Sequence, residues 1–345
     1  MLFRTANLTQ LAEFDEIIDV RTPAEFAEDH IPGATNYPVL SNEERITVGT
    51  LYKQSSPFEA KKIGAVMVAK NIAQHIETNF HSRPKSWSAL IYCWRGGQRS
   101  GAMSIVLGQI GWAVKQLEGG YKTYRSDVLQ KLESLPATFN YKVICGATGS
   151  GKSHLLTALA AAGKQVLDLE KLAQHRGSVL GGWPLQTQPT QKSFDSTLLQ
   201  TLKSFDPSRP VFIEAESNKI GRITLPNSLF KAMHAGDCLL LETALEARIQ
   251  LLLTDYQHFL TNPALLSSKL QSLLPFHGRT QLDYWQQLIA EEKFTELIAD
   301  LLAVHYDPSY HKATSKHYSK LAQPKKIQLL NLSDTTLQSV IETLI

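Results

Sequence analysis

Short apolar runs alternate along this chain with longer segments in which apolar residues recur at helical spacing. Near the N-terminus, residues 16–20 and 90–93 are predicted to be short buried strands, and residues 23–29 and 63–80 have helical periodicity. Because strands that alternate with helices form parallel sheets, this pattern predicts an α/β domain.

A second α/β series begins after the periodicity is lost around residues 132–140, where Pro136 interrupts the sequence. We therefore predict one domain over residues 1–134 and another over residues 135–345. The strands expected in the second domain are residues 141–145, 165–169, 211–214, 238–242 and 327–332. Its first helix is expected over residues 151–162, with Gly163 as its cap, and a mostly helical stretch over residues 244–302.

The composition is that of a two-domain globular protein, with 345 residues of which 43% are hydrophobic. A run of about 18 apolar residues, as needed to cross a membrane, is absent, and the N-terminus lacks the build of a signal peptide. Three cysteines are too few for a disulfide framework and fit a reducing compartment. We therefore expect a cytoplasmic protein. A net charge of +3 is too small to indicate nucleic-acid binding without a local basic patch.

Cys93 begins the run Cys-Trp-Arg-Gly-Gly-Gln-Arg-Ser, which lies between a predicted strand and an apolar helix over residues 101–110. Two glycines let this loop curl with backbone N–H groups pointing inward, and the helix N-terminus adds positive potential, so the loop suits a thiolate or a bound anion. We predict Cys93 as the reactive residue. The predicted anion loop, to which both arginines add a full positive charge, consists of Arg95, Gly96, Gly97 and Arg99. Cys145 and Cys238 are predicted to be small buried hydrophobic residues.

The N-terminal domain resembles rhodanese domains over about residues 1–127. The resemblance is carried by the Cys93 loop and by three segments, Ile18 to Phe26, His30 to Asn36 and Leu117 to Tyr121. It implies that the cysteine carries sulfur or selenium as a persulfide or perselenide. Cys93 and Arg99 have C-x5-R spacing, which is one residue wider than in many small rhodaneses and is shared with cysteine-dependent phosphatases. Asp19 and Arg21 are predicted to stabilise the domain rather than to react.

The segment Gly146 to Ser153 matches the phosphate-loop pattern G-x-x-x-x-G-K-S, and it lies between a predicted strand and a predicted helix. Backbone N–H groups of such a loop surround a diphosphate, Lys152 neutralises its charge, and Ser153 is placed to bind Mg²⁺. The predicted diphosphate-binding residues are Gly146, Gly149, Ser150, Gly151, Lys152 and Ser153. The predicted fold class is therefore α/β, with an N-terminal rhodanese-like domain and a C-terminal P-loop NTPase-like domain built on a parallel sheet. Whether the ligand is a nucleotide or another diphosphate ester stays open.

Two polar clusters are expected at the carboxyl ends of strands of the second domain, where ligands bind in open α/β sheets. Their candidate residues for substrate or metal are Asp168, His175, Arg176, Glu214 and Glu216. As ordinary surface charge these residues would need no function, so both interpretations stay open.

Taken together, the motifs resemble the tRNA 2-selenouridine synthase family. The likeness adds Leu167 to Ser178 and Ile213 to Gly221 to the two loops and runs through nearly the whole chain. It implies a transferase that acts on 2-thiouridine at the wobble position of tRNA. Geranyl diphosphate first alkylates the sulfur, and selenophosphate then supplies selenium. The resemblance implies no bound organic cofactor, and it implies an enzyme that produces selenophosphate as a further partner.

Residues 308–331 contain five lysines and no acidic residue. Lys312, Lys316 and Lys320 are predicted to share a helix face, on which they would bind tRNA. Tyr306, Tyr310 and Tyr318 are interleaved with them and are expected to stack on splayed bases. A solvated terminal helix is the alternative.

Two other functions fit the same motifs. The first is a C-x5-R cysteine phosphatase or sulfurtransferase fused to a small-molecule kinase. The second is a regulatory module without catalysis, in which the phosphate loop binds a nucleotide as a switch.

Overall fold

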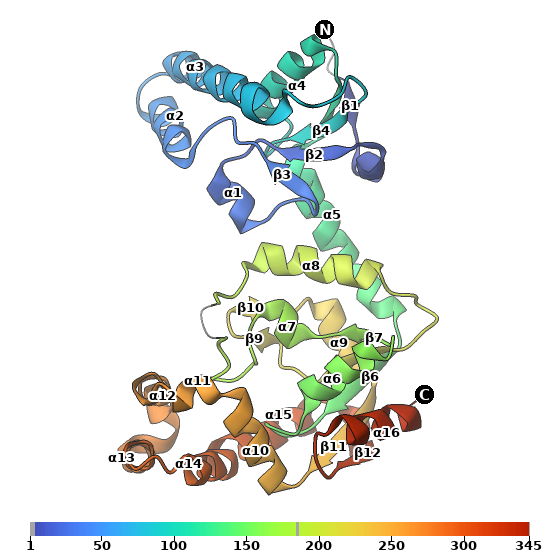
Figure 1. Ribbon diagram of the computed structural model, residues 1–345, viewed down its shortest axis with the longest axis vertical. Helices are drawn as coiled ribbons and strands as arrows, with labels where there is room; N and C mark the ends of the chain where they lie inside the picture. Colours follow the sequence, from blue (N-terminus) through green and yellow to red (C-terminus); the bar gives the residue numbers. More distant parts are fainter. Residues whose placement is uncertain (1–3, 184–185, 345) are drawn as a thin grey trace. The chain divides into compact units, whose positions relative to one another are not determined.

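The computed structural model describes residues 4–183 and 186–344. The chain forms two compact units, Met1–Lys131 and Leu132–Ile345 (Figure 1).

The first unit is built on a five-stranded parallel sheet with the order β1-β5-β4-β2-β3. Its strands are β1 (Thr5–Ala6), β2 (Glu16–Asp19), β3 (Ala34–Asn36), β4 (Ser88–Tyr92) and β5 (Ala113–Leu117). Its helices are α1 (Pro23–Glu28), α2 (Asn42–Gln54), α3 (Pro57–His75), α4 (Gln98–Ile110) and α5 (Gly120–Ser134), with shorter turns at Leu8–Glu13 and Ile76–Phe80. Ala89 to Tyr92 are buried, as expected for a central strand of a parallel sheet that is covered on both faces.

The second unit has a five-stranded parallel sheet with the order β12-β11-β6-β8-β7. These strands are β6 (Tyr141–Cys145), β7 (Gln165–Leu167), β8 (Val211–Glu214), β11 (Asp237–Thr243) and β12 (Lys325–Leu329). The remaining strands, β9 (Lys219–Ile220) and β10 (Ile223–Thr224), form a small antiparallel pair. The helices nearest the sheet in sequence are α6 (Lys152–Ala161), α7 (Leu169–Ala173), α8 (Gln191–Lys203), α9 (Asn227–Ala235) and α16 (Asp334–Leu344).

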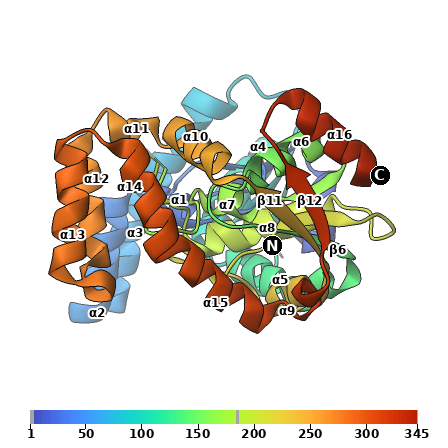
Figure 2. The same ribbon diagram turned by 90° about the horizontal axis from the view of Figure 1, so that it is seen from below.

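A group of helices, here called the helical lobe, lies to one side of this sheet (Figure 2). It consists of α10 (Leu245–Asp255), α11 (Gln257–Leu260), α12 (Pro263–Leu270), α13 (Leu274–Ala290) and α14 (Phe294–Leu301). Its hydrophobic core is a cluster that includes Leu270, Trp285, Leu288 and Leu297. The chain then returns to the sheet through a π-helical turn (Leu302–Tyr306), α15 (Asp307–His317) and a short 3-10 turn (Ser319–Ala322).

The predicted α/β order is confirmed in both units, but β1, β3, β5, β9 and β10 were not predicted, and some predicted elements end at other residues. β7 stops at Leu167 rather than Leu169, because the Asp168 side chain accepts the Lys171 N–H at 2.8 Å and caps α7. The last strand runs over Lys325–Leu329 instead of residues 327–332.

Candidate active sites

Cys93 directly follows β4, and its side chain is buried. Its Sγ accepts hydrogen bonds from the Gly97 N–H at 3.2 Å and from the Ser100 hydroxyl at 3.1 Å. Gln116 of β5 donates to the Gly97 carbonyl and to Ser100 Oγ, at 3.0 and 2.7 Å, and so holds the loop in this shape. These two donors fix the position of the sulfur at the start of α4, so the geometry suits a reactive cysteine.

The two arginines of the Cys93 loop differ from each other. We expected both to add an uncompensated charge, but Arg99 forms a two-bond pair with Glu25 of α1, at 2.6 and 3.1 Å. Burial raises the pKa of Glu25, but the Arg99 guanidinium outweighs this and lowers that pKa to about 2. The charge of Arg99 is therefore compensated within the unit. Arg95 is exposed.

Asp19 and Arg21 stabilise the first unit, as predicted. Arg21 is buried, pairs with Asp19 at 2.6 Å and donates to the carbonyl of Asp29 at 2.6 Å. Its guanidinium also lies 4.0 Å from the ring centroid of Tyr121. Cys145 and Cys238 are buried free thiols, which also agrees with the prediction.

The phosphate loop lies between β6 and α6, as its sequence predicted. Gly149 and Gly151 have φ angles of +76° and +89°, which a residue with a Cβ rarely adopts. Lys152 Nζ donates to the Gly146 carbonyl at 2.7 Å, so the amino group folds back over the loop. The loop therefore has the curled backbone that surrounds a phosphate group.

Three residues that sequence reasoning missed hold this loop in place. Arg248 of α10 donates to the Thr148 carbonyl at 2.9 Å and pairs with Asp307 at 2.6 Å. The Tyr310 hydroxyl accepts the Gly146 N–H at 2.7 Å. Arg248 lies 100 positions beyond Thr148 and Tyr310 lies 164 positions beyond Gly146, while Asp307 acts only through Arg248, so no local pattern could have revealed these contacts.

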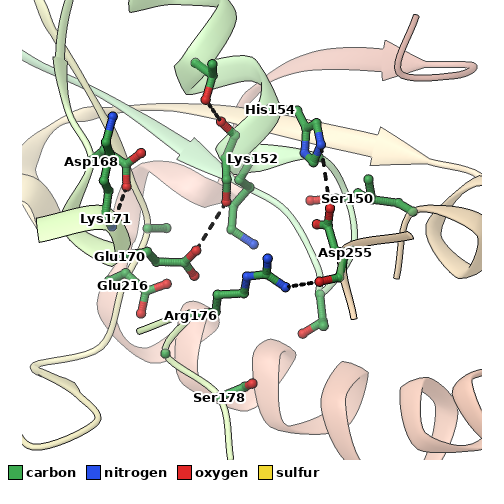
Figure 3. Close-up of a pocket in the computed structure, with 18 of the residues that line it drawn as sticks. Ser150, Lys152, His154, Asp168, Glu170, Lys171, Arg176, Ser178, Glu216 and Asp255 are labelled. Atoms are coloured by element: carbon green, nitrogen blue, oxygen red, sulfur yellow. Dashed lines mark hydrogen bonds and ion pairs between the residues drawn. The ribbon is translucent and has the colours of Figure 1, made fainter. Parts of the chain in front are cut away.

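The phosphate loop forms one wall of a pocket of about 1510 Å³, here called the phosphate-loop pocket. Figure 3 shows Lys152 and Arg176 reaching into it from different segments of the second unit. Arg176 donates to the Asp255 carbonyl at 2.9 Å, and its guanidinium lies 4.6 Å from the ring centroid of Tyr256. Two cations that point into one pocket repel each other, and a bound diphosphate would remove that repulsion.

Acidic side chains lie beside the loop. The Ser153 hydroxyl donates to Glu170 Oε2 at 3.2 Å, and the Glu170 N–H donates to Glu214 Oε1 at 2.8 Å. Burial and the neighbouring carboxylates raise the pKa of Glu214 well above its ordinary value. Burial, with the Glu170 carboxylate, raises the pKa of Glu216 to about 8. Of the two, only Glu216 lines the pocket, and a cation bound beside it would lower its pKa.

The structure separates the five candidates of the two polar clusters. Asp168, Arg176 and Glu216 line the phosphate-loop pocket together with the loop itself. Glu214 is buried behind the wall, where it accepts the Glu170 N–H. His175 is also outside the lining, and its Nδ1 accepts the Gly177 N–H at 3.1 Å. Burial lowers the pKa of His175, so its neutral form is favoured.

No group of three or more His, Cys, Asp and Glu side chains within residues 4–183 and 186–344 is arranged to hold a metal ion. A Mg²⁺ ion next to a phosphate group needs fewer protein ligands, because phosphate and water oxygens complete its shell. The Ser153 hydroxyl and the Glu170 carboxylate supply oxygen ligands of the right kind.

Comparison with known proteins identifies both units. A model described as the tRNA 2-selenouridine synthase AAA domain matches residues 139–277, and a rhodanese-like domain model matches residues 5–127. A tRNA 2-selenouridine synthase of Nitrosomonas europaea is 35% identical over 266 residues, which cover 75% of this chain and 67% of the relative. One of Shewanella loihica is 31% identical over 342 residues, which cover 89% of each chain. The chain belongs to the tRNA 2-selenouridine synthase family.

Part of this chain is similar to solved structures. A rhodanese-related protein from Thermoplasma volcanium is 18% identical, with a TM-score of 0.24, over 36% of this chain and 93% of that one. Residues 278–345, which include α14, α15 and α16, lie outside both family-model matches.

The basic segment of this family member differs from the prediction. Lys312 and Lys316 lie in α15, but the helix ends at His317. Lys320 follows in a separate 3-10 turn and pairs with Asp237 at 2.8 Å. The predicted face of three lysines is therefore wrong for Lys320, because the non-helical backbone at Tyr318 changes the direction of the chain.

The three tyrosines of this segment also have a different place from the one predicted. Tyr306, Tyr310 and Tyr318 line the phosphate-loop pocket. Tyr318 is only 4% exposed, and its hydroxyl donates to the Glu216 carbonyl at 3.3 Å. The expectation that these rings stack on splayed bases is therefore wrong for Tyr318, which is buried, whereas Tyr306 and Tyr310 are half-buried and stay untested for this role.

In the part of the chain that the structure describes, no helix has the length and apolar character needed to cross a membrane.

Proposed function

We propose that this member of the family converts 2-thiouridine at the wobble position of tRNA into 2-selenouridine through an S-geranyl-2-thiouridine intermediate. Geranyl diphosphate and selenophosphate are its co-substrates, and the enzyme is a transferase. The observation that carries the proposal is the presence, in separate units, of a buried thiol held by N–H and O–H donors and a phosphate loop that opens into a large pocket.

In the first half-reaction the phosphate-loop pocket holds the diphosphate. Backbone N–H groups of the loop, Lys152 and Arg176 stabilise the negative charge that the leaving diphosphate gains as its C–O bond breaks. The sulfur of the thiouracil forms the new S–C bond, and the proton on the ring nitrogen N3 is lost to solvent. A Mg²⁺ ion held by Ser153 and Glu170 would neutralise part of the diphosphate charge.

In the second half-reaction the Cys93 thiolate attacks the phosphorus of selenophosphate, the P–Se bond breaks to release hydrogen selenide, and water then hydrolyses the new S–P bond to free phosphate and Cys93. The released selenide replaces the alkylated sulfur. A C–Se bond forms at carbon C2 of the base, the C–S bond breaks, and geranylthiol leaves with a proton. Alkylation makes this exchange easier, since a neutral thiol is a better leaving group than sulfide. The Gly97 N–H and the Ser100 hydroxyl stabilise the anionic sulfur of Cys93 that this role requires.

The test is a stepwise incubation of the full chain with tRNA that bears 2-thiouridine. Mass spectrometry of digested nucleosides should show S-geranyl-2-thiouridine after geranyl diphosphate is added, and 2-selenouridine after selenophosphate is added. If neither nucleoside forms, and the chain instead releases phosphate from an aryl phosphate in a reaction that needs Cys93, the proposal is wrong and the phosphatase alternative is supported.

A further inference from the structure

A second cavity, of about 60 Å³, lies inside the helical lobe and is here called the apolar cavity. Its walls come mainly from α10, α11 and α14 and include Leu252, Phe259, Leu297 and Leu301. Phe259, Leu297 and Leu301 are 4% exposed or less, and they belong to the hydrophobic cluster of the lobe. The cavity is therefore an unfilled space within a packed core.

The apolar cavity adjoins the phosphate-loop pocket. Thr148, Ser178, Leu252, Tyr256 and Tyr306 line both spaces. Leu252 packs directly on the phosphate loop, since a Cβ built on Gly149 would lie 3.0 Å from Leu252 Cδ1. A ligand held by the loop therefore has the mouth of the apolar cavity beside it.

Protein cores are packed closely, and spaces larger than a water molecule are few. A single water needs roughly 10–15 Å³ on the scale used for such cavities, so this one has room for several non-hydrogen atoms. Its polar lining atoms, the hydroxyls of Thr148, Ser178, Tyr256 and Tyr306, belong to the residues shared with the larger pocket. The deeper walls give water or a nucleotide base no hydrogen-bond partner, whereas an alkyl chain would fill the space.

We propose that the apolar cavity receives the distal part of the hydrocarbon tail of an alkyl diphosphate whose diphosphate lies on the phosphate loop. The inference rests on the proposed function, and it names the residues that would recognise the alkyl donor of that reaction. A five-carbon tail ends near the mouth of the cavity, a ten-carbon tail enters it, and a fifteen-carbon tail overfills it. The cavity therefore sets the chain length of the donor.

The experiment offers the full chain dimethylallyl, geranyl and farnesyl diphosphates in competition, with tRNA that bears 2-thiouridine. Alkylated nucleosides are counted by mass spectrometry. The wild-type chain should favour the ten-carbon donor. Leu297→Phe, which fills the cavity, should shift the product ratio toward the five-carbon group by about tenfold, because each methylene that is no longer buried costs a few-fold in binding. Leu297→Ala should shift the ratio toward the fifteen-carbon group.

Leu288 supplies the matched control, because it is a buried leucine of the same hydrophobic cluster that does not line the cavity. Leu288→Ala should leave the product ratio unchanged although it also removes core volume. If Leu297→Phe does not fold, Ile298→Phe serves in its place, since Ile298 lines the cavity and is only half-buried. An unchanged ratio in a folded cavity variant would overturn the inference.

Calorimetric binding to the wild-type chain without tRNA separates this inference from the proposed function. Geranyl diphosphate should bind more tightly than inorganic diphosphate by about tenfold or more, and Leu297→Phe should remove most of that difference. If no alkyl group is transferred but this binding pattern holds, the proposed function fails and the cavity assignment stands. Equal affinity for geranyl and inorganic diphosphate would overturn the cavity assignment, whatever the transfer assay shows.

Discussion

Lys152 is the residue through which the phosphate loop is expected to act on the leaving diphosphate. Its amino group points into the phosphate-loop pocket and at present donates to the Gly146 carbonyl. Lys152→Ala should lower the rate of geranyl transfer by roughly 10²–10³-fold, as for loss of one charged or hydrogen-bonding group that faces developing negative charge.

The assay for this prediction is the initial rate of S-geranyl-2-thiouridine formation, with folding checked by circular dichroism. Lys164→Ala is the control, because Lys164 belongs to the same unit but does not line the pocket. A folded Lys152→Ala chain that transfers geranyl at the wild-type rate would refute the assignment of the loop to the diphosphate.

The pair of Glu25 and Arg99 predicts a pH dependence of stability. The folded-state pKa of Glu25, about 2, lies below its ordinary value of 4.5, so the pair stabilises the fold fully above pH about 4.5 and loses this effect as the pH falls toward 2. We expect Glu25→Gln to lower the free energy of unfolding of the first unit at pH 6 by on the order of 1–2 kcal/mol, after allowance for partial exposure.

Calorimetry of the full chain and of Glu25→Gln across this pH range checks the sign. The difference between the two proteins should shrink as the pH is lowered through 4.5. A difference that stays constant down to pH 3 would show that the ionised carboxylate contributes nothing through Arg99.

At the residue scale, sequence reasoning succeeded where chemistry is local. The Cys93 turn and the phosphate loop are each formed by about eight consecutive residues, so spacing predicts their shape. It failed for the charge of Arg99, whose partner Glu25 is 74 positions away. It also could not separate Glu214, the last residue of β8, from Glu216 two positions later, since which of the two lines the pocket depends on tertiary packing.

Helix α10 connects the phosphate loop with the rest of the helical lobe, because its Arg248 contacts the loop and its Leu252 lines the apolar cavity. Arg248→Ala should leave Asp307 without this ion pair and loosen the loop, so KM for geranyl diphosphate should rise about tenfold. Steady-state kinetics measure the change. Arg248→Lys is the matched variant: it keeps the charge but loses the two-bond geometry, and it should lie between wild type and Arg248→Ala.

An unchanged KM in Arg248→Ala would mean that the loop keeps its shape without support from α10. The thermal midpoints of both variants show whether either substitution destabilises the fold. If Arg248→Ala does not fold, the KM of Arg248→Lys decides whether the loop depends on Arg248.

Helix α15 carries the part of the basic segment that still predicts tRNA binding. Lys312→Glu combined with Lys316→Glu should weaken tRNA binding and reduce the slope of log affinity against log salt by about 2, because two fewer counterions are released. Filter binding at several salt concentrations measures both quantities. Lys164→Glu is the control for a change of charge elsewhere, and an unchanged slope would return α15 to the solvated-helix alternative.

At the element scale, periodicity predicted the alternation of strands and helices but not where α15 ends. The break at Tyr318 comes from tertiary contacts: its hydroxyl donates to the Glu216 carbonyl, and its ring lies 4.6 Å from that of His234. A helical pattern in the sequence does not reveal such contacts. The spacing of four residues between the lysines therefore predicts one continuous helix, although the chain turns at Tyr318.

Over the whole molecule, the chain length and the loss of periodicity around residues 132–140 predicted two domains, and the comparisons assign a family domain to each of the two units. What the sequence did not predict is the apolar cavity. Its walls come from helices whose leucines look like ordinary core residues, and a space between them depends on how the side chains pack.

We expect the two half-reactions to be divided between the units, so that the second unit alkylates sulfur and Cys93 of the first unit delivers selenium. Cys93→Ser keeps the size and hydrogen bonding of the side chain, but its hydroxyl stays protonated where a thiol can ionise. The measurement is the nucleoside composition of thiolated tRNA after incubation of this variant with geranyl diphosphate and selenophosphate. We predict that S-geranyl-2-thiouridine accumulates and 2-selenouridine is absent. Loss of geranylation in a folded Cys93→Ser chain that still binds tRNA would contradict the claim and place both half-reactions at one shared site.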